Sequence, residues 1–403
     1  MRFLMPVAFA VVYAAVPLFP AFISLTSVAY PGVSMVPAPM VYSILGCVCL
    51  LAAYAGAALW RRRAESPPQP LLAPMLAWFC ASMLAALLGL DPPNGVIFVS
   101  IFGLSIVWGL ALVAFWNDPG VATAVFWSYT ISGALAAATA LAMLATRHPA
   151  ALYAIGHGRA IGTFVLPGEL AAYLVIFVPF VYAVARIARP RALRATAWIA
   201  MALGLAALAA TVSRAGWMGF AAAAAFVAAT QARGRRGGAL AATLIVAAGF
   251  AVVALFFNAQ HNPSEDYTRI SIWQAATQVI DRFPLTGVGP FDFSRIYPLV
   301  RVPDGEVSAF HAHSIYLTFF AELGVLGLGA FLWNVWAVAR TVIARVPLAS
   351  PEGAVLALAA AAGLVGVAVQ GLIDTMSIVI FGLWMPTMGL AVAAAQWRAP
   401  ERS

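Results

Sequence analysis

Apolar runs of roughly 18–25 residues recur from one end of the chain to the other, and each is long enough to cross about 30 Å of hydrocarbon as an α-helix. The runs do not alternate with period two, as the strands of a membrane barrel do. Charged residues make up only 9% of the sequence, against about 25% in a soluble domain. Because only helices and closed barrels satisfy their backbone groups in lipid, the sequence predicts an all-α polytopic membrane protein.

The expected transmembrane helices number about twelve and leave no stretch for a separate soluble domain. They cover residues 4–24, 38–60, 71–90, 96–116, 120–145, 162–186, 194–212, 215–231, 239–257, 314–340, 353–372 and 377–397. The first run is longer than the apolar core of a usual secretory signal, so we expect it to be a retained span. We therefore expect residues 1–403 to form a single integral membrane domain.

The arginines, which supply all 22 basic residues, are distributed unevenly between the two sides of this topology. One side carries 15 of them: Arg2, Arg61, Arg62, Arg63, Arg186, Arg189, Arg191, Arg194, Arg233, Arg235, Arg236, Arg340, Arg345, Arg398 and Arg402. The other carries 7: Arg147, Arg159, Arg214, Arg269, Arg282, Arg295 and Arg301. The positive-inside rule calls the first side cytoplasmic, and an even number of spans places both termini there. The net charge of +8 thus follows from topology and gives no reason to expect a nucleic acid partner.

One connector on the outward side, residues 258–313, is far longer than an ordinary helix connection. Within it, residues 266–281 predict an amphipathic helix that lies on the membrane, with Ile272, Ala276 and Val279 on its apolar side. Because long loops are usually functional, we expect this loop to lie over the active site.

Two outward arginines stand in positions that suit an anion. Ser213 is a good N-cap residue, so Arg214 falls in the first turn of the next span, where a bound anion would interact with helix N–H groups and guanidinium together. Arg269 shares a face of the loop helix with Trp273. The alternatives are an Arg214 side chain that extends to the membrane interface, and an Arg269 that pairs with Asp266 or contacts lipid head groups.

Two histidines stand where the long loop meets the next span. His311 and His313 lie close in sequence to Tyr316, and a neutral imidazole there is a candidate general base, because its pKa lies near working pH. No Cys or carboxylate stands at a zinc-ligand spacing from them, so we expect no metal. On an ideal helix Glu322 lies about 180° around from His313, so we expect this buried carboxylate to accept hydrogen bonds from a neighbouring element.

Taken together, these segments resemble the O-antigen ligase and O-antigen polymerase superfamily of bacterial membrane glycosyltransferases, which are of the GT-C type. The matching stretches are Ser213–Gly216 (SRAG), Arg269–Trp273 (RISIW), Phe283–Gly289 (FPLTGVG), His311–Leu317 (HAHSIYL) and Glu322–Gly327 (ELGVLG). A weaker match is Arg159–Phe164 (RAIGTF), after which many members continue with Asn-Pro-Asn and this chain departs with Leu166–Glu169 (LPGE).

The resemblance implies a metal-independent, inverting transfer without a cofactor, on the periplasmic side of the Gram-negative inner membrane. The donor would be an O-antigen glycan linked to undecaprenyl diphosphate, and the acceptor would be lipid A-core. The roles that it implies are diphosphate binding for Arg214, Arg269 and Arg159, base catalysis for His313 or else His311, and a supporting role for Ser213, Trp273, Tyr316 and Glu322.

A ligase is favoured over the alternatives within the superfamily because the chain is compact, with one main periplasmic loop and two histidines at its end. The alternatives are an O-antigen polymerase, which extends the lipid-linked glycan, and a protein-glycosylating relative. From a different class, a transporter of lipid-linked sugars would be expected to show inverted repeats or charges at mid-span. The charges in this chain stand mostly at the outer ends of the spans.

Overall fold

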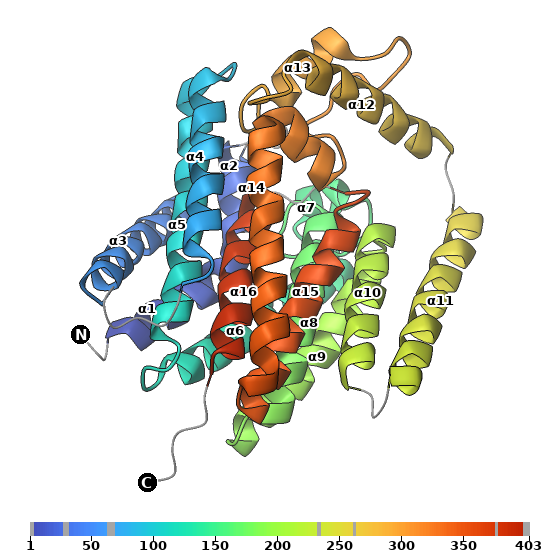
Figure 1. The fold of residues 1–403 in the computed structure, drawn as a ribbon. Coiled ribbons are helices and arrows are strands. Elements are labelled where there is room, and N and C mark those ends of the chain that lie inside the picture. The colour runs from blue at the N-terminus through green and yellow to red at the C-terminus, as the bar shows by residue number, and fades with distance from the viewer. Residues whose placement is uncertain are drawn as a thin grey trace.

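The computed structural model describes residues 4–26, 32–62, 69–231, 235–260, 263–374 and 378–397, and this part of the chain consists of helices and loops without a strand (Figure 1). The helices of the bundle are α1 (Leu4–Ala15), continued by η1 (Val16–Leu18) into α2 (Phe19–Thr26), α3 (Ala38–Arg62), α4 (Leu72–Leu88), α5 (Pro92–Phe115), α6 (Val121–Thr146), α8 (Pro167–Ile187), α9 (Arg191–Ala210), α10 (Arg214–Gln231), α11 (Arg235–Gln260), α14 (Ile315–Arg345), α15 (Pro351–Gln370) and α16 (Ile378–Ala395). The other elements are α7 (Ala150–Ile155), α12 (Pro263–Arg282), α13 (Phe293–Val300) and η2 (Val346–Leu348).

Every expected span coincides with a helix of this bundle, or with the α1–α2 pair. In the described part of the chain, 8 helices are long and apolar enough to cross a membrane, and Leu72–Leu88, Arg236–Ala251 and Leu383–Ala395 are shorter apolar helices. The prediction of an all-α polytopic membrane protein is therefore confirmed.

The two ends of the bundle differ: arginines of α8 and α14 lie at one end and the long loop lies at the other. In Figure 1 the C-terminal ends of α8, α10 and α14 lie together at the lower end, and the last turns of α8 and α14 contain Arg186 and Arg345. The long loop, with α12 and α13, lies across the upper end. Of the arginines assigned to the cytoplasmic side, Arg2, Arg63, Arg233, Arg398 and Arg402 lie outside the described residues.

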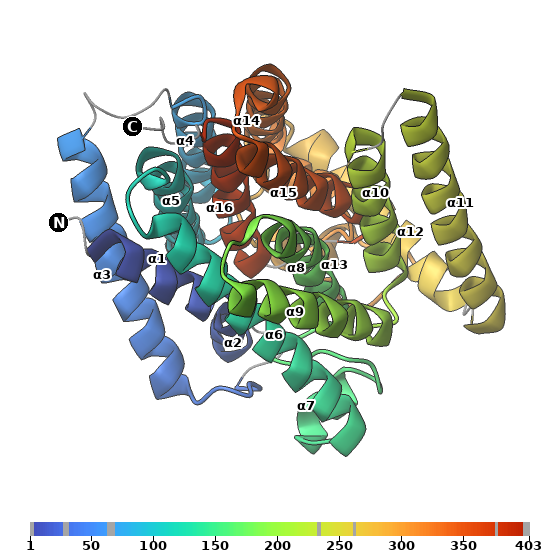
Figure 2. The same ribbon diagram turned by 90° about the horizontal axis from the view of Figure 1, so that it is seen from below.

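Helix α8 occupies the middle of one half of the bundle, with α9, α10 and α15 around it (Figure 2). Small residues bring these helices close together. A Cβ added to Gly219 of α10 would lie 2.5 Å from the carbonyl oxygen of Gly366 in α15, and one added to Gly216 would lie 2.5 Å from the Cβ of Ala171 in α8. Close approach of this kind is the usual role of glycine between membrane helices, and it fixes the upper ends of α8, α10 and α15 beside one another.

Helix α14, which coincides with the expected span 314–340, is bent. Gly324 has φ 63° and ψ −169°, which interrupts the helix. The ring centroids of Phe319 and Phe331 lie 4.9 Å apart, whereas 12 residues of straight helix would separate them by about 18 Å along the axis. The first turns therefore fold back toward the remainder of α14, and the turn depends on glycine because other residues rarely adopt a positive φ.

The long loop has a small hydrophobic core of its own. The apolar residues of α12 that we expected on the membrane, Ile272, Ala276 and Val279, are buried against Phe293 and Tyr297 of α13. The helix is present as expected, and its apolar side is covered by protein. Helix α13 was not anticipated, because eight residues with an internal proline give little periodic signal.

Candidate active site

The two histidines are in direct contact at the start of α14. The backbone N–H of His313 donates to Nδ1 of His311 at 3.2 Å, and the ring centroids are 4.5 Å apart. His313 adopts φ 46°, in the left-handed region, which turns the chain between the loop and the helix. Within the described residues, Nδ1 of His313 is buried without a hydrogen-bond partner. Nδ1 of His311 is thus occupied as an acceptor, while Nδ1 of His313 makes no hydrogen bond to the described residues.

The end of α15 holds the start of α14 in place. The backbone N–H of Ile315 donates to the carbonyl oxygen of Gly371 at 2.8 Å, and the hydroxyl of Ser314 reaches the same oxygen at 3.4 Å. The hydroxyl of Tyr316 donates to the carbonyl oxygen of Ala368 at 3.0 Å. These bonds satisfy carbonyl groups that a helix C-terminus leaves open, and they fix the backbone next to His313.

Arg269 of α12 lies close enough to act electrostatically on both histidines. Burial, and to a lesser extent the positive charge of Arg269, lowers the pKa of His313 from 6.5 to about 4. Burial, His313 and Arg269 together lower the pKa of His311 well below its usual value. Both rings are therefore neutral at working pH, as a base that accepts a proton must be.

Arg214 begins α10, where the sequence placed it. The hydroxyl of Ser213 accepts a hydrogen bond from the backbone N–H of Gly216 at 3.1 Å and so caps the helix. Arg159 belongs to the neighbouring loop, because the backbone N–H of Ala160 donates to the carbonyl oxygen of Ala210 at the end of α9 at 3.0 Å. Arg159 and Arg214 thus lie on adjoining segments at this end of the bundle.

A buried glutamine connects the helix ends around the site. The side-chain amide of Gln370 donates to the carbonyl oxygen of Gly168 in α8 at 2.9 Å, and the Cβ of Gln370 would lie 3.1 Å from a Cβ added to Gly219. Gly371, the next residue, accepts the N–H of Ile315. The end of α15 therefore contacts the first turns of α8 and α10 and the start of α14.

Two carboxylates lie at the start of α8. Oε2 of Glu169 accepts the backbone N–H of Val165 at 3.3 Å, which stabilises the N-terminus of its own helix. The carboxylate of Asp374 packs on Gly168, since a Cβ added there would lie 2.4 Å from Oδ2 of Asp374. Among the residues that the structure describes, no three His, Cys, Asp or Glu side chains gather as they would around a metal ion.

Glu322 lies at the bend of α14, two residues before Gly324. The histidines precede the first turn of the same helix. The carboxylate of Glu322 accepts hydrogen bonds from the backbone N–H groups of Phe291 and Phe293, and its carbonyl oxygen accepts the N–H of Gly289 at 3.0 Å. The stretches Phe283–Gly289 and Glu322–Gly327 are thereby joined, although about 30 residues separate them along the chain. Trp273 of α12 is partly buried, and its indole N–H has no hydrogen-bond partner in the described part of the chain.

Some residues at this end of the bundle were not predicted as site residues from the sequence. Gln370 is an amide at the end of an apolar run, and only the fold shows which helices it joins. Asp91, Asp292 and Arg295 form an ion-pair network between α5 and the long loop. Asp91 could have been recognised as a helix N-cap, because Pro92 and Pro93 follow it, but its partners are about 200 residues away.

The comparison with known families bears on the same segments. Residues 199–332 match the family model described as O-antigen ligase, and this region includes Arg214, Arg269, His311 and His313. No curated protein matches the chain. The match over residues 199–332 supports the resemblance to the O-antigen ligase and O-antigen polymerase superfamily that the sequence predicts.

Proposed function

We propose that the protein is an O-antigen ligase of the GT-C type, which transfers a glycan from undecaprenyl diphosphate to lipid A-core on the periplasmic face of the Gram-negative inner membrane. The observation that carries this proposal is the contact of His311 with His313 within electrostatic reach of Arg269, at the end of the bundle where α10 begins with Arg214. A proton acceptor and guanidinium groups at one end of the bundle suit a transfer in which a hydroxyl is deprotonated and a diphosphate leaves.

The arginines supply the charge that the leaving group requires. Arg214 and Arg269, assisted by Arg159, bind the diphosphate through bidentate guanidinium contacts. The N-terminus of α10 adds backbone N–H groups and the positive end of its dipole. Preorganised positive charge of this kind stabilises the negative charge that develops on the departing oxygen, so that we expect no metal to be required.

The chemical step is a single displacement. The oxygen of an acceptor hydroxyl attacks the anomeric carbon of the donor glycan, and the bond from that carbon to the diphosphate oxygen breaks. The electron pair leaves with undecaprenyl diphosphate, and the hydroxyl proton passes to His313, with His311 as the alternative base. One displacement inverts the configuration at the anomeric carbon.

The charge of Arg269 couples donor binding to the strength of the base. In the free protein burial and the Arg269 charge lower the pKa of His313. A bound diphosphate offsets that positive charge, so the pKa of His313 rises toward its usual value once the donor is in place. The base is then stronger in the complex, where it is needed, than in the free protein.

The long loop gives the site a cover. Helices α12 and α13 lie across this end of the bundle (Figure 1), and their core is closed by Ala312 from the histidine segment and Ala321 from α14. A covered site limits the transfer of the glycan to water instead of the acceptor. The lipid tails of donor and acceptor would remain in the bilayer beside the bundle.

The superfamily also contains polymerases, and the same residues would serve a polymerase that uses a second lipid-linked glycan as acceptor. The first test is therefore whether purified protein in liposomes consumes the lipid-linked donor only when an acceptor is present. Acceptor-dependent consumption that is unchanged by EDTA supports the enzyme. Movement of intact donor across the bilayer without consumption would instead support a transporter.

A further inference from the structure

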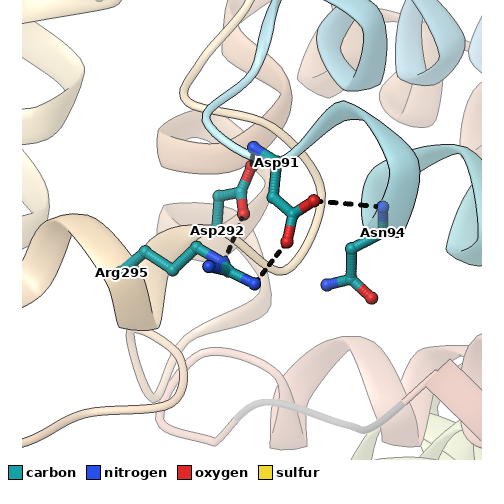
Figure 3. A network of polar contacts seen from close by, with 4 residues as sticks. All are labelled: Asp91, Asn94, Asp292 and Arg295. Atoms are coloured by element: carbon teal, nitrogen blue, oxygen red, sulfur yellow. Dashed lines mark hydrogen bonds and ion pairs between the residues drawn. The ribbon is translucent and has the colours of Figure 1, made fainter.

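Three charged residues join the turn between α4 and α5 to α13. The guanidinium of Arg295 pairs with the carboxylates of Asp91 and Asp292, as Figure 3 shows. Its Nε lies 3.3 Å from Oδ1 of Asp292. The backbone N–H of Asp91 donates to Oδ2 of Asp292 at 2.9 Å, while Oδ1 of Asp91 accepts the N–H of Asn94 at 3.3 Å and caps α5. We name Asp91, Asp292 and Arg295 the clasp.

The backbone beside the clasp is also tightly packed. The N–H of Leu90 donates to the carbonyl oxygen of Val288 at 2.9 Å, and a Cβ added to Gly89 would lie 2.7 Å from the Cα of Gly289. Asp292 is only 1% exposed. Burial raises the pKa of Asp292, and the hydrogen bond from Asp91 and the charge of Arg295 oppose that rise. The clasp therefore offsets part of the cost of a buried carboxylate, which an unpaired Asp292 would leave uncompensated.

A row of aromatic rings leads from the clasp to the histidines. Phe291 precedes Asp292 and has φ 67°, a strained value that its surroundings must enforce. Its ring stacks on Phe98 of α5 at 4.1 Å between centroids and contacts Phe310 at 6.2 Å. Phe310 in turn meets the ring of His311 at 6.1 Å. The backbone of Phe291 is held on one side by the clasp and on the other by Glu322.

We propose that the clasp is a positioning device for the proposed transfer: Asp91, Asp292 and Arg295 hold Phe291, and Phe291 acts through Phe310 to set the place of His311 and His313. The clasp residues touch neither donor nor acceptor in this scheme. The inference rests on the proposed function where it predicts a change in kcat. The predicted change in the position of the histidines does not depend on that function.

The experiment compares conservative and disruptive changes in the full-length protein. Arg295→Gln removes the shared charge, Arg295→Lys keeps the charge but loses the planar fork, and Asp91→Asn keeps the α5 cap but loses the ion pair. Arg282→Gln is the matched control, because Arg282 is an exposed arginine in the last turn of α12 and is not one of the three residues of the clasp. Each variant is measured for kcat, acceptor KM and donor affinity, and for the rate at which diethyl pyrocarbonate modifies the peptide that contains His311 and His313. Exposed His157 serves as the internal reference.

We expect Arg295→Gln to lower kcat by up to about 100-fold, the size of effect that a small misplacement of a catalytic group produces. Donor affinity should stay at the wild-type value, the histidine peptide should react faster, and Arg295→Lys should recover part of kcat. A folded Arg295→Gln protein with wild-type kcat and wild-type histidine reactivity would overturn the inference. So would a parallel loss of donor affinity, which would make Arg295 a binding residue.

The two proposals fail in different ways. If His313→Ala remains fully active, the assignment of the base is wrong, yet the modification rates of the histidine peptide still report whether the clasp positions it. If His313→Ala is inactive and Arg295→Gln changes neither kcat nor those rates, the clasp inference alone is wrong.

Discussion

The backbone N–H of His313 donates a hydrogen bond to Nδ1 of His311 at 3.2 Å. This bond occupies one nitrogen of His311 and fixes the orientation of its ring relative to the next turn of the chain. Nδ1 of His313 has no such bond to any residue that the structure describes. The two rings are chemically alike but differ in what they can accept, which favours His313 as the base and gives His311 a supporting place beside it.

The histidine variants should separate these two roles. His313→Ala should lower the rate of transfer by about 10²–10⁴-fold, the usual contribution of a general base, and leave the affinity for the lipid-linked donor unchanged. His311→Ala should have the smaller effect, because it removes only the acceptor of the His313 N–H. Single-turnover transfer and equilibrium donor binding measure the two quantities. A larger loss for His311→Ala would reverse the assignment, and loss of donor binding by His313→Ala would indicate a structural histidine.

The pH dependence follows from the lowered pKa of His313. Since this pKa is about 4 in the free protein, kcat/KM should not fall with an apparent pKa near 6.5 as pH is lowered, and the acid limb should lie near pH 4. Removing the nearby positive charge with Arg269→Gln favours the protonated ring, so the acid limb should move to higher pH. An unshifted limb in a variant that still transfers would contradict the coupling.

The lowered pKa of His313 should also make the stability of the folded protein depend on pH. Between about pH 6.5 and 4 the unfolded chain binds a proton at His313 that the folded chain does not. The folded state therefore loses stability as pH falls through this window, and His313→Asn should reduce that loss in thermal unfolding scans.

Loss of Arg214 or Arg269 should first of all weaken binding of the lipid-linked donor. Arg214→Ala and Arg269→Ala should each lower transfer by about 10²–10³-fold, as the loss of a preorganised charge contact does, and weaken binding of undecaprenyl diphosphate. Arg214→Lys should restore little, because an ammonium lacks the bidentate fork. Arg282→Ala controls for the general charge of the outward side. Normal transfer by either Arg214→Ala or Arg269→Ala would remove that residue from the phosphate site.

The bend of α14 gives a stability test with a matched control. Gly324 has φ 63°, and a Cβ there would lie 2.2 Å from the carbonyl oxygen of Leu285, so Gly324→Ala should destabilise the protein by about 1–3 kcal/mol. Gly329 lies in the same helix with nothing within 4 Å of an added Cβ, and Gly329→Ala should be neutral or slightly stabilising. Thermal unfolding in one detergent compares the pair, and equal melting temperatures would contradict the account of the bend.

Hydrophobic run length was sufficient to predict the helices of the bundle, because the backbone of a lipid-facing segment has so few solutions. It could not predict the bend of α14. The run around Gly324 is apolar throughout, and the partners that replace its helical hydrogen bonds, such as the carbonyl oxygen of Pro284 for the N–H of Val325, come from a distant loop. Burial of the apolar side of α12 was missed for the same reason, since the pattern of Ile272 and Ala276 is alike for a lipid surface and a protein surface.

The candidate site was visible in the sequence as types of residue, but not as an arrangement. Arginine and histidine on the outward side were informative because charges near a membrane span are costly and seldom without a role. The contact of Gln370 with Gly168, and the sharing of Arg295 between Asp91 and Asp292, depend on packing between segments about 200 residues apart. No local periodicity carries that information.

The identity of the product tests the central claim most directly. Purified protein is reconstituted with undecaprenyl-diphosphate-linked glycan and lipid A-core, and the masses of all lipid-linked products are measured for the wild type and for His313→Ala. We expect the wild type to yield lipid A-core that carries the glycan, with inverted anomeric configuration, and His313→Ala to yield almost none. Longer glycans on undecaprenyl diphosphate, with unmodified lipid A-core, would contradict a ligase and identify a polymerase.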